Sequence, residues 1–463
     1  MRKERDLLGE RQIPDKAYYG VQTLRAIENF RISGVPISHY PDLIRAFAMV
    51  KLAAARANAE VGALDLKILP PVEKACQELI DGKLHDQFAV DVFQGGAGTS
   101  TNMCANEVIA NRALELMGKE KGQYKYCDPH DHINLAQSTN DAYPSSLHLG
   151  IALLNTKLIA EMRLLVASFL VKGDEFKEIV KMGRTQLQDA VPMTLGQEFV
   201  AFGRSLDNEV VALERIESVL LDVNMGGTAI GTGLNAPKGF SKACVKHLAE
   251  ISGKKIKLAA DLVEATQSTQ PFVLYSSVLK SLAIKLSKIC NDLRLLSSGP
   301  RAGFFEINLP AKQPGSSIMP GKVNPVIPEV MNQVCFKAIG NDLTVTMAAE
   351  AGQLQLNVME PVIASCIFES QTLFINAART LREECVDGIT ANADVCKRFV
   401  EFSIGVVTAL NPVIGYEKAT ELAAEALKTG RGVVELVREK KLLTEKEIAK
   451  VLDPMAMAGT VRE

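Results

Sequence analysis

The sequence lacks an excess of charge of either sign. It contains 52 lysine and arginine residues against 54 aspartate and glutamate residues, which gives a formal net charge of −2 at pH 7. A protein that binds nucleic acid through its phosphates usually presents a basic surface, and this composition supplies none. We therefore predict no nucleic-acid partner.

Long apolar runs are also missing. Stretches such as Leu164 to Val171 are far shorter than the ~20 residues that a helix needs to cross a bilayer. The chain begins MRKERD, which is charged and lacks the apolar core of a secretory signal. We therefore expect a soluble, cytoplasmic protein with no membrane partner.

The cysteines show no pairing pattern. They number nine, they are scattered, and no two are spaced as CxxC. This argues against a disulfide framework or a structural zinc site and predicts buried free thiols in a reducing compartment. His130 and His132 could ligate a metal as an HxH pair, but no further ligands are visible beside them. We expect no required cofactor, and the sequence leaves activation by a divalent cation open.

The dominant positive signal is helical periodicity of unusual length. Apolar residues recur at steps of three and four along four stretches, and Gly226-Gly227 and Ser298-Gly299-Pro300 end two of them. Long helices in succession, without regularly alternating strands, predict a mainly α protein built on an elongated helical bundle. The four stretches are 153–169, 210–223, 274–296 and about 329–350.

The two ends of the chain differ from this helical middle. Turn residues are frequent over residues 1–40, so we expect an irregular start. After Asn411-Pro412 the pattern is of short helices, one of which opens with a capping box at Thr444 and Glu447. We predict three domains: an N-terminal domain over 1–140, a central helical bundle domain over 141–395 and a small C-terminal helical domain over 396–463.

Polar, glycine-rich segments interrupt the helical stretches. Each one gathers hydroxyl, amide and backbone N–H donors where a helix begins or ends, and helix N-termini bind anions. Several such segments that converge would form a carboxylate or phosphate site. They are residues 95–103, 137–141, 183–188, 226–233 and 315–325.

None of these segments is a nucleotide-binding motif. Gly315 and Gly321 have five residues between them and Val323 follows Lys322, whereas a P-loop has four residues there and Ser or Thr after the lysine. Residues 231–236 resemble GxGxxA, but they follow a helix instead of a strand, so a connecting turn is the better interpretation. The GxSxG nucleophile elbow is absent from the sequence.

Residues 315–325, GSSIMPGKVNP, resemble the signature loop of the aspartase/fumarase superfamily. The chain is most similar to the aspartases within it, since Thr139 stands where class II fumarases carry a second serine. The resemblance implies a mainly helical protein of three domains. It also implies a homotetramer with a twenty-helix core, whose active sites are each shared by three subunits. Further matching segments are AYYGVQTLRAIENF (17–30), GTSTNMCANEV (98–108), QSTND (137–141), LNPVIGY (410–416) and residues 350–360.

The reaction that the resemblance implies is the reversible elimination of ammonia from L-aspartate to give fumarate. A base removes the proton beside the side-chain carboxylate, and the site must stabilise the resulting aci-carboxylate with its two negative charges. By resemblance the base is Ser316, acting as an oxyanion. Its pKa must fall for this role, and Lys322 with the N–H groups of the loop could lower it, each pKa unit being worth about 1.4 kcal/mol. The alternative is a class II fumarase-type hydro-lyase that converts malate to fumarate.

The resemblance also implies which residues hold the substrate. Taken singly, serine, threonine and asparagine at such places are common helix caps, but their order over the segments favours a site. Gln186 stands where the family often has histidine, and a neutral amide cannot shuttle protons, which favours an aspartase. Gln186 and Glu329 would support the residues that touch the substrate without touching it themselves. The resemblance implies no role for His130. The implied contacts are Ser317, Lys322 and Asn324 to one carboxylate, with Thr99, Ser138, Thr139, Asn140 and Thr185 to the other carboxylate and the ammonium.

Overall fold

The computed structural model describes residues 1–451, 453 and 457–459, and this part of the chain is mainly helical. It divides into two compact units, each assembled from segments far apart in the sequence. Unit 1 comprises residues 1–159, 211–281 and 336–374. Unit 2 comprises residues 160–210, 282–335 and 375–463. The three predicted domains with their boundaries stay a prediction.

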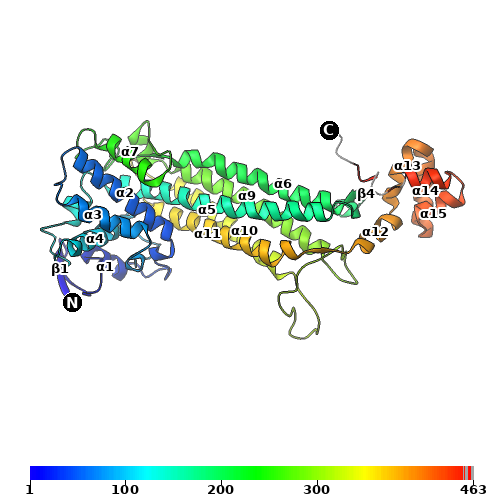
Figure 1. Ribbon diagram of the computed structural model, residues 1–463, viewed down its shortest axis with the longest axis horizontal. Coiled ribbons are helices and arrows are strands. Elements are labelled where there is room, and N and C mark those ends of the chain that lie inside the picture. The colour runs from blue at the N-terminus through cyan, green and yellow to red at the C-terminus, as the bar shows by residue number, and fades with distance from the viewer. Residues whose placement is uncertain (452, 454–456, 460–463) are drawn as a thin grey trace. The chain divides into compact units, whose positions relative to one another are not determined.

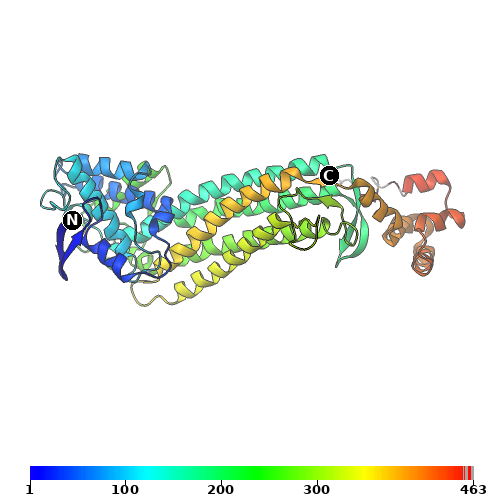
Figure 2. The ribbon, with the colours of Figure 1, turned by 90° about the horizontal axis from the view of Figure 1, so that it is seen from below.

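Within unit 1 the helices α5 (Thr139–Glu175), α9 (Gln270–Leu296) and α11 (Glu360–Glu384) lie side by side (Figures 1 and 2), which confirms the predicted helical bundle. Within unit 1 the buried Gln371 amide donates hydrogen bonds to the Ile151 carbonyl at 3.0 Å and to the Tyr275 hydroxyl at 2.7 Å. Tyr275 in turn donates to Asn155 at 2.8 Å. These polar contacts fix α5, α9 and α11 against one another inside an apolar core. The other long helices are α6 (Leu195–Ile216) and α10 (Val326–Glu350).

One of the four predicted helical stretches ends early. Helix α6 stops at Ile216, and the chain continues through the 3₁₀ turn η4 (Glu217–Leu220) into strand β5 (Asp222–Val223). Strand β5 pairs in parallel with β6 (Lys257–Leu258). The prediction was wrong here because Leu220 and Val223 keep helical spacing and are buried. The Leu221 and Val223 carbonyl groups instead accept from the N–H groups of Lys257 and of Ala259, the residue after β6.

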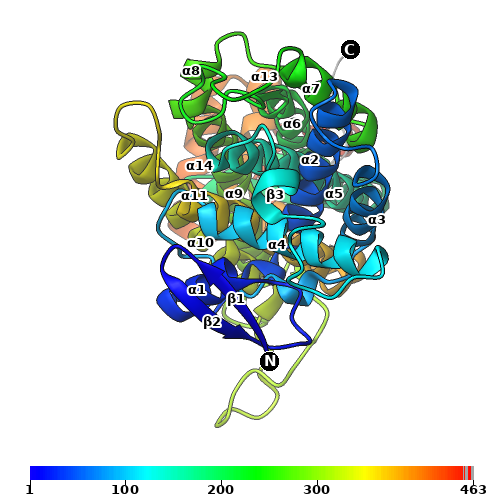
Figure 3. The same ribbon diagram turned by 90° about the vertical axis from the view of Figure 1, so that its left-hand side faces the viewer.

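The start of the chain is more regular than we expected. Strands β1 (Arg2–Asp6) and β2 (Gly9–Ile13) form an antiparallel hairpin that lies beside α1 (Val21–Asn29) (Figure 3). All residues of β1 are charged, and its buried position is Glu4, so no apolar alternation marks this strand in the sequence. The other elements of unit 1 are α2 (Pro41–Glu60), α3 (Leu69–Ile80), α4 (Thr99–Leu116), α7 (Phe240–Ser252), α8 (Leu262–Gln267), the 3₁₀ turns η1 (Ile37–His39) and η2 (His85–Gln87), and the π-helical turn η3 (Pro129–Ile133).

Unit 2 carries two small antiparallel strand pairs and the short helices of the C-terminal region. The capping box is confirmed: the Thr444 hydroxyl accepts from the Glu447 N–H at 3.3 Å, and the Glu447 carboxylate accepts from the Thr444 N–H at 2.8 Å. The elements are β3 (Val180–Thr185) with β4 (Gln188–Thr194), β7 (Ile307–Asn308) with β8 (Thr390–Ala391), η5 (Val386–Gly388), α12 (Ala393–Phe402), η6 (Ile404–Val406), α13 (Val407–Ile414), α14 (Tyr416–Thr429), α15 (Val433–Glu439) and α16 (Glu445–Val451).

All nine cysteine side chains are buried and free, as predicted, and the reducing compartment stays a prediction. In the described part of the chain, the helices are either too short or too polar to span a bilayer.

Candidate functional site

The N-termini of α4 and α5 carry the predicted substrate contacts of unit 1. Thr99 opens α4, Thr139 opens α5, and the Asn102 amide donates to the Thr139 hydroxyl at 3.2 Å. Gly98 precedes α4 with φ +87°, and a Cβ there would lie 2.3 Å from the ring of Tyr143. Only glycine lets the two helix ends approach in this way. The Thr99 N–H already donates to the Gly96 carbonyl at 3.0 Å and the Asn140 N–H to the Ser138 hydroxyl at 3.2 Å. This corner can therefore offer an anion its hydroxyl and amide side chains and the positive ends of two helix dipoles.

Asp141 fixes the segment that carries Ser138, Thr139 and Asn140. Its carboxylate is fully buried and accepts from the Ser138 N–H at 2.9 Å, the Gly226 N–H at 3.0 Å and the Thr228 N–H at 2.9 Å. Burial raises the pKa of Asp141 to about 6, and the three N–H donors oppose that rise. Asp141 therefore ties the predicted substrate segment to the glycine-rich loop 226–233.

Asn140 is held by loop 226–233 and by Asn224, which precedes that loop. The Asn140 side-chain amide donates to the Ala229 carbonyl at 2.7 Å, and the Asn140 carbonyl accepts from the Asn224 amide at 2.9 Å. Loop 226–233 is thus a support for Asn140. Residues 231–236 form part of the connection between β5 and α7, which confirms the turn interpretation of that segment.

Lys51 is a buried amine behind the same segment. It is 0% exposed and donates to Asn134 at 3.0 Å and to Gln137 at 2.9 Å. Burial lowers its pKa to about 7, and the charge of Asp141 acts in the opposite direction. The sequence offered one signal that we did not use: Lys51 interrupts an otherwise apolar and alanine-rich stretch of α2.

Thr185 and Gln186 lie exposed at the turn between β3 and β4 in unit 2. Gln186 has φ +55° and Leu187 has φ +62°, as the tight turns that suit β-hairpins require. The preceding Arg184 pairs with the fully buried Glu306 at 2.8 Å. This ion pair anchors the turn that presents Thr185.

The signature loop places Ser316 next to amide donors. The Ser316 hydroxyl oxygen accepts from the N–H groups of Ile318 at 3.2 Å and Met319 at 3.0 Å. The loop closes where the Gly315 N–H donates to the Lys322 carbonyl at 2.7 Å. A Cβ on Gly315 would lie 2.6 Å from that carbonyl oxygen, so the closure needs glycine.

The remaining predicted residues of this loop are more open. Ser317 and Lys322 are exposed, whereas Asn324 is half-buried and donates to the Gly315 carbonyl at 2.6 Å. Glu329 lies half-buried in the first turn of α10. In the part of the chain that the structure describes, no hydrogen bond or ion pair joins the 185–186 turn to the loop or to Glu329.

The predicted site residues therefore belong to two groups. Thr99 and residues 138–140 are in unit 1, and the others are in unit 2. Within unit 1 the structure brings the α4 and α5 residues together through Asn102. Unit 2 contributes the 185–186 turn and the 315–324 loop as separate elements. The buried supports Lys51, Asp141 and Glu306 were missed, because their partners come from distant parts of the sequence.

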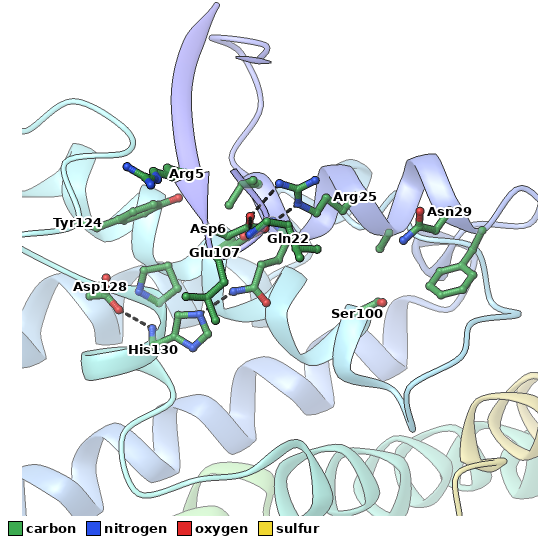
Figure 4. Close-up of a pocket in the computed structure, with 16 residues that line it drawn as sticks. Arg5, Asp6, Gln22, Arg25, Asn29, Ser100, Glu107, Tyr124, Asp128 and His130 are labelled. Carbon is green, nitrogen blue, oxygen red and sulfur yellow. Dashed lines mark hydrogen bonds and ion pairs between the residues drawn. The ribbon is translucent and has the colours of Figure 1, made fainter. Parts of the chain in front are cut away.

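His130 lines a cavity of about 850 Å³ in unit 1 (Figure 4). Among its lining residues, Arg25 binds Asp6 through two contacts of 2.7 and 2.8 Å. The His130 Nε2 atom lies 2.6 Å from the Gln22 amide nitrogen. His130 thus joins the π-helical turn η3 to α1. His132 has its own partner, since its Nδ1 accepts from the Asp128 N–H at 2.8 Å.

Comparison with known proteins adds to this geometry. A family model described as "Lyase" matches residues 9–340, and one described as "Fumarase C C-terminus" matches residues 406–459. An aspartate ammonia-lyase of Pseudomonas aeruginosa is 60% identical over 98% of this chain and 96% of that enzyme. An aspartate ammonia-lyase of Escherichia coli K12 is 56% identical over 97% of this chain and 94% of that enzyme.

Solved structures share the fold. The cobalt-bound fumarate lyase:delta crystallin of Brucella melitensis has a TM-score of 0.96 at 53% identity, covering 99% of this chain and 100% of that one. The class II fumarase of Schistosoma mansoni has a TM-score of 0.93 at 34% identity, covering 99% of each chain. The mainly α fold is thus that of several solved lyases.

Proposed function

Because the chain belongs to the fumarase/aspartase superfamily of lyases, we propose that it deaminates L-aspartate reversibly to fumarate and ammonia. The observation that carries the proposal is the identity to aspartate ammonia-lyases along nearly the whole chain. The fold alone would not distinguish an aspartase from a fumarase, because both share it. Thr139 and Gln186 agree with the aspartase assignment.

Ser316 is the base in this proposal. A serine hydroxyl loses its proton reluctantly, so its oxyanion must be stabilised before it can abstract the Cβ proton of aspartate. The N–H groups of Ile318 and Met319 already point at the Ser316 oxygen and would stabilise negative charge there. Lys322, on the same loop, adds a positive charge to the field that favours both the oxyanion and the aci-carboxylate.

In this proposal the groups that bind the substrate carboxylates come from different subunits. Thr99, Ser138, Thr139 and Asn140 present hydroxyl and amide side chains at helix N-termini, which suit a carboxylate. From unit 2 the substrate contacts are Thr185, Ser317, Lys322 and Asn324, with Gln186 and Glu329 behind them. The chemistry is acid–base elimination within these side chains, so we propose no required cofactor. The buried free thiols agree with a cytoplasmic location.

A homotetramer with active sites shared by three subunits would complete the site. Apolar side chains on the unit 1 part of α10 stand in solvent: Phe336 is 61% exposed, Leu343 61% and Met347 65%. An exposed apolar stripe on a long helix indicates a surface that another chain covers. Sedimentation is expected to give about 200 kDa, four times 50.2 kDa.

Mixing tests the shared site directly. Ser316→Ala and Thr139→Val subunits, each inactive alone, should regain activity when mixed and reassembled, because some sites then receive both intact groups. A fully active monomer, or mixtures that stay inactive after verified exchange of subunits, would contradict the shared site.

The reaction itself is tested by the ultraviolet absorbance of fumarate with aspartate or malate as substrate. We expect aspartate to be at least roughly a thousandfold better than malate, since a designed polar contact discriminates by several kcal/mol. Comparable rates on both would contradict the aspartase assignment. Activity on malate alone would make the chain a class II fumarase-type hydro-lyase.

A further inference from the structure

Two buried asparagines, one turn apart on α4, differ in a single contact. Asn102 is 1% exposed and Asn106 is 0% exposed. One N–H of each amide donates to the Asn134 side-chain oxygen, at 3.2 Å from Asn102 and at 3.1 Å from Asn106. The Asn102 amide also donates to the Thr139 hydroxyl at 3.2 Å, whereas the Asn106 amide donates to the Met103 sulfur at 3.3 Å. Of this pair, only Asn102 therefore contacts a residue of the proposed substrate site.

The hydrogen bonds of Asn134 decide which atom of the Asn102 amide faces which partner. The Asn134 amide nitrogen donates to the Gln137 carbonyl at 3.2 Å, so the Asn134 oxygen must point the other way. That oxygen also accepts from the fully buried Lys51 amine at 3.0 Å. Asn102 can face an oxygen only with its amide nitrogen. It keeps this orientation although its own amide oxygen is buried without a hydrogen-bond partner among the described residues, which is unfavourable.

The orientation of Asn102 limits what the Thr139 hydroxyl can do. A threonine hydroxyl has one O–H group to donate and two lone pairs that accept. Asn102 donates to one of the lone pairs, and no residue that the structure describes accepts the O–H group. Thr139 is half-buried in the first turn of α5. Its proton is therefore left for a bound ligand, and the acceptors that aspartate offers are its carboxylate oxygens.

The reverse orientation of the Asn102 amide would have the opposite effect. Its oxygen would then accept the Thr139 proton, and the hydroxyl would turn only lone pairs toward the substrate. We propose that Asn102 is a positioning residue for substrate recognition, which directs the Thr139 hydroxyl proton toward a substrate carboxylate. This inference rests on the proposed function. Asn134 and Lys51 act one step further back, since they hold the Asn102 amide in the required orientation.

The first test compares Asn102→Ala with Asn106→Ala. Succinate has both carboxylates of aspartate and no ammonium group, so calorimetry of the assembled protein with succinate measures carboxylate binding alone. The succinate dissociation constant should rise roughly tenfold in Asn102→Ala, the effect of about one lost hydrogen bond to a charged group. Asn106→Ala removes an equally buried amide from the same oxygen, and its constant should stay within about twofold of wild type, because Asn106 has no link to Thr139.

Double variants show whether Asn102 acts through Thr139. Calorimetry does not require activity, so it also measures Thr139→Val. In that background the hydroxyl is gone, and Asn102→Ala should not weaken succinate binding further. In a Thr139→Ser background the hydroxyl remains, and Asn102→Ala should again raise the dissociation constant roughly tenfold. A side chain that only fills space would have the same effect in every background.

Steady-state kinetics separates the carboxylates from the ammonium group. In the direction of aspartate synthesis, Asn102→Ala should raise the KM for fumarate roughly tenfold and leave the KM for ammonia within about twofold, because Thr139 donates to a carboxylate. The kcat should change less than the KM for fumarate, since the contact is made in the ground state and in the transition state alike.

Asn102→Asp covers the case in which the alanine variant does not assemble. It keeps the shape of the side chain and puts an oxygen in place of the amide nitrogen. That oxygen would accept the Thr139 proton, so succinate binding should weaken at least as much as we expect for Asn102→Ala. Asn106→Asp is the matched control, because it adds the same charge one turn away, and it should weaken binding less.

Three results would overturn the inference. The first is a succinate dissociation constant in Asn102→Ala or Asn102→Asp that stays within about twofold of wild type. The second is an equal loss in the corresponding Asn106 variant, and the third is an undiminished loss in the Thr139→Val background. The failure of the proposed function looks different, because wild-type protein would then fail to release fumarate from aspartate.

Discussion

The two polar segments at the centre of the proposed site are built in opposite ways. Residues 137–141 are held by buried groups: Lys51 of α2 donates to Gln137, and Asp141 accepts from two N–H groups of loop 226–233. The signature loop 315–325 is largely exposed and is held mainly by its own contacts, between Gly315 and the Lys322 carbonyl and between Asn324 and the Gly315 carbonyl.

The difference indicates a division of labour. Substrate recognition needs donors whose positions do not change, and a buried network supplies that. A base on a loop can instead close over the bound substrate and exclude water, which strengthens every electrostatic contact inside. Gly321, with φ +79°, gives the loop a backbone conformation that other residues rarely adopt. We infer that residues 137–141 form a fixed half of the site, which selects the substrate. The signature loop 315–325 forms an adaptable half, which carries out the chemistry.

The largest expected effect is on the adaptable half. Ser316→Ala removes the base and leaves the carboxylate contacts, so kcat should fall by roughly 10²–10⁴ while KM changes far less. Steady-state kinetics of purified protein, with its assembly checked by sedimentation, measures this. If kcat stays within about threefold of wild type, Ser316 only caps its loop and another group takes the proton.

On the fixed half, Asp141→Asn should act mainly on binding. The amide replaces an oxygen that accepts two N–H groups, so the 137–141 segment loses its tie to loop 226–233. We expect kcat/KM for aspartate to fall roughly 10- to 100-fold, with KM carrying most of the change. Asp65→Asn is the control, because Asp65 accepts one N–H in an exposed turn. A loss confined to kcat would assign Asp141 to the chemical step and remove the contrast between the halves.

Gly315→Ala tests how much geometry the adaptable half requires. The added Cβ would lie 2.6 Å from the Lys322 carbonyl oxygen and 2.8 Å from the Asn324 nitrogen, both backbone atoms. The loop must therefore shift, and kcat should fall roughly tenfold, because small displacements of catalytic groups are costly. Gly432→Ala is the matched control, since a Cβ there meets its nearest atom at 3.6 Å. Wild-type kcat in Gly315→Ala would show a loop that tolerates displacement.

The two halves also differ in how far the sequence predicted them. The signature loop was predicted residue by residue, because GSSIMPGKVNP is a long contiguous match whose glycines are required locally. The long helices followed from apolar spacing. The hairpin of β1 and β2 was missed because even its buried position in β1 is a glutamate, Glu4, so the strands show no apolar alternation. The early end of α6 was missed because Leu220 and Val223 keep helical spacing after the helix stops.

The supports of the fixed half could not be predicted for a different reason. The roles of Lys51 and Asp141 depend on groups brought together by folding, such as the Gly226 N–H that donates to Asp141. A single sequence carries no signal for such pairings beyond an unusual polar residue in an apolar stretch, as at Lys51. A contiguous motif can therefore be predicted from one sequence, whereas buried contacts between distant segments cannot.

The smallest expected effect is on the pH dependence of the free energy of unfolding, which we expect to depend on Lys51 and not on Ser316. Burial holds the pKa of Lys51 at about 7 against an ordinary 10.5, so between these values the unfolded chain binds the proton and the folded chain does not. The free energy of unfolding therefore rises with pH across this range, by at most about 1.4 kcal/mol per pH unit for one group. Asp141 faces Lys51 and already carries its charge there, while burial raises the pKa values of the nearby Cys76 and Cys244 thiols, so that they stay neutral.

Urea unfolding of Lys51→Met at fixed protein concentration should show a flatter dependence between pH 7 and 10, whereas Ser316→Ala should keep the wild-type slope. Equal slopes for Lys51→Met and wild type would mean that the amine stays charged in the folded protein, and that the support behind residues 137–141 is an ion pair with Asp141.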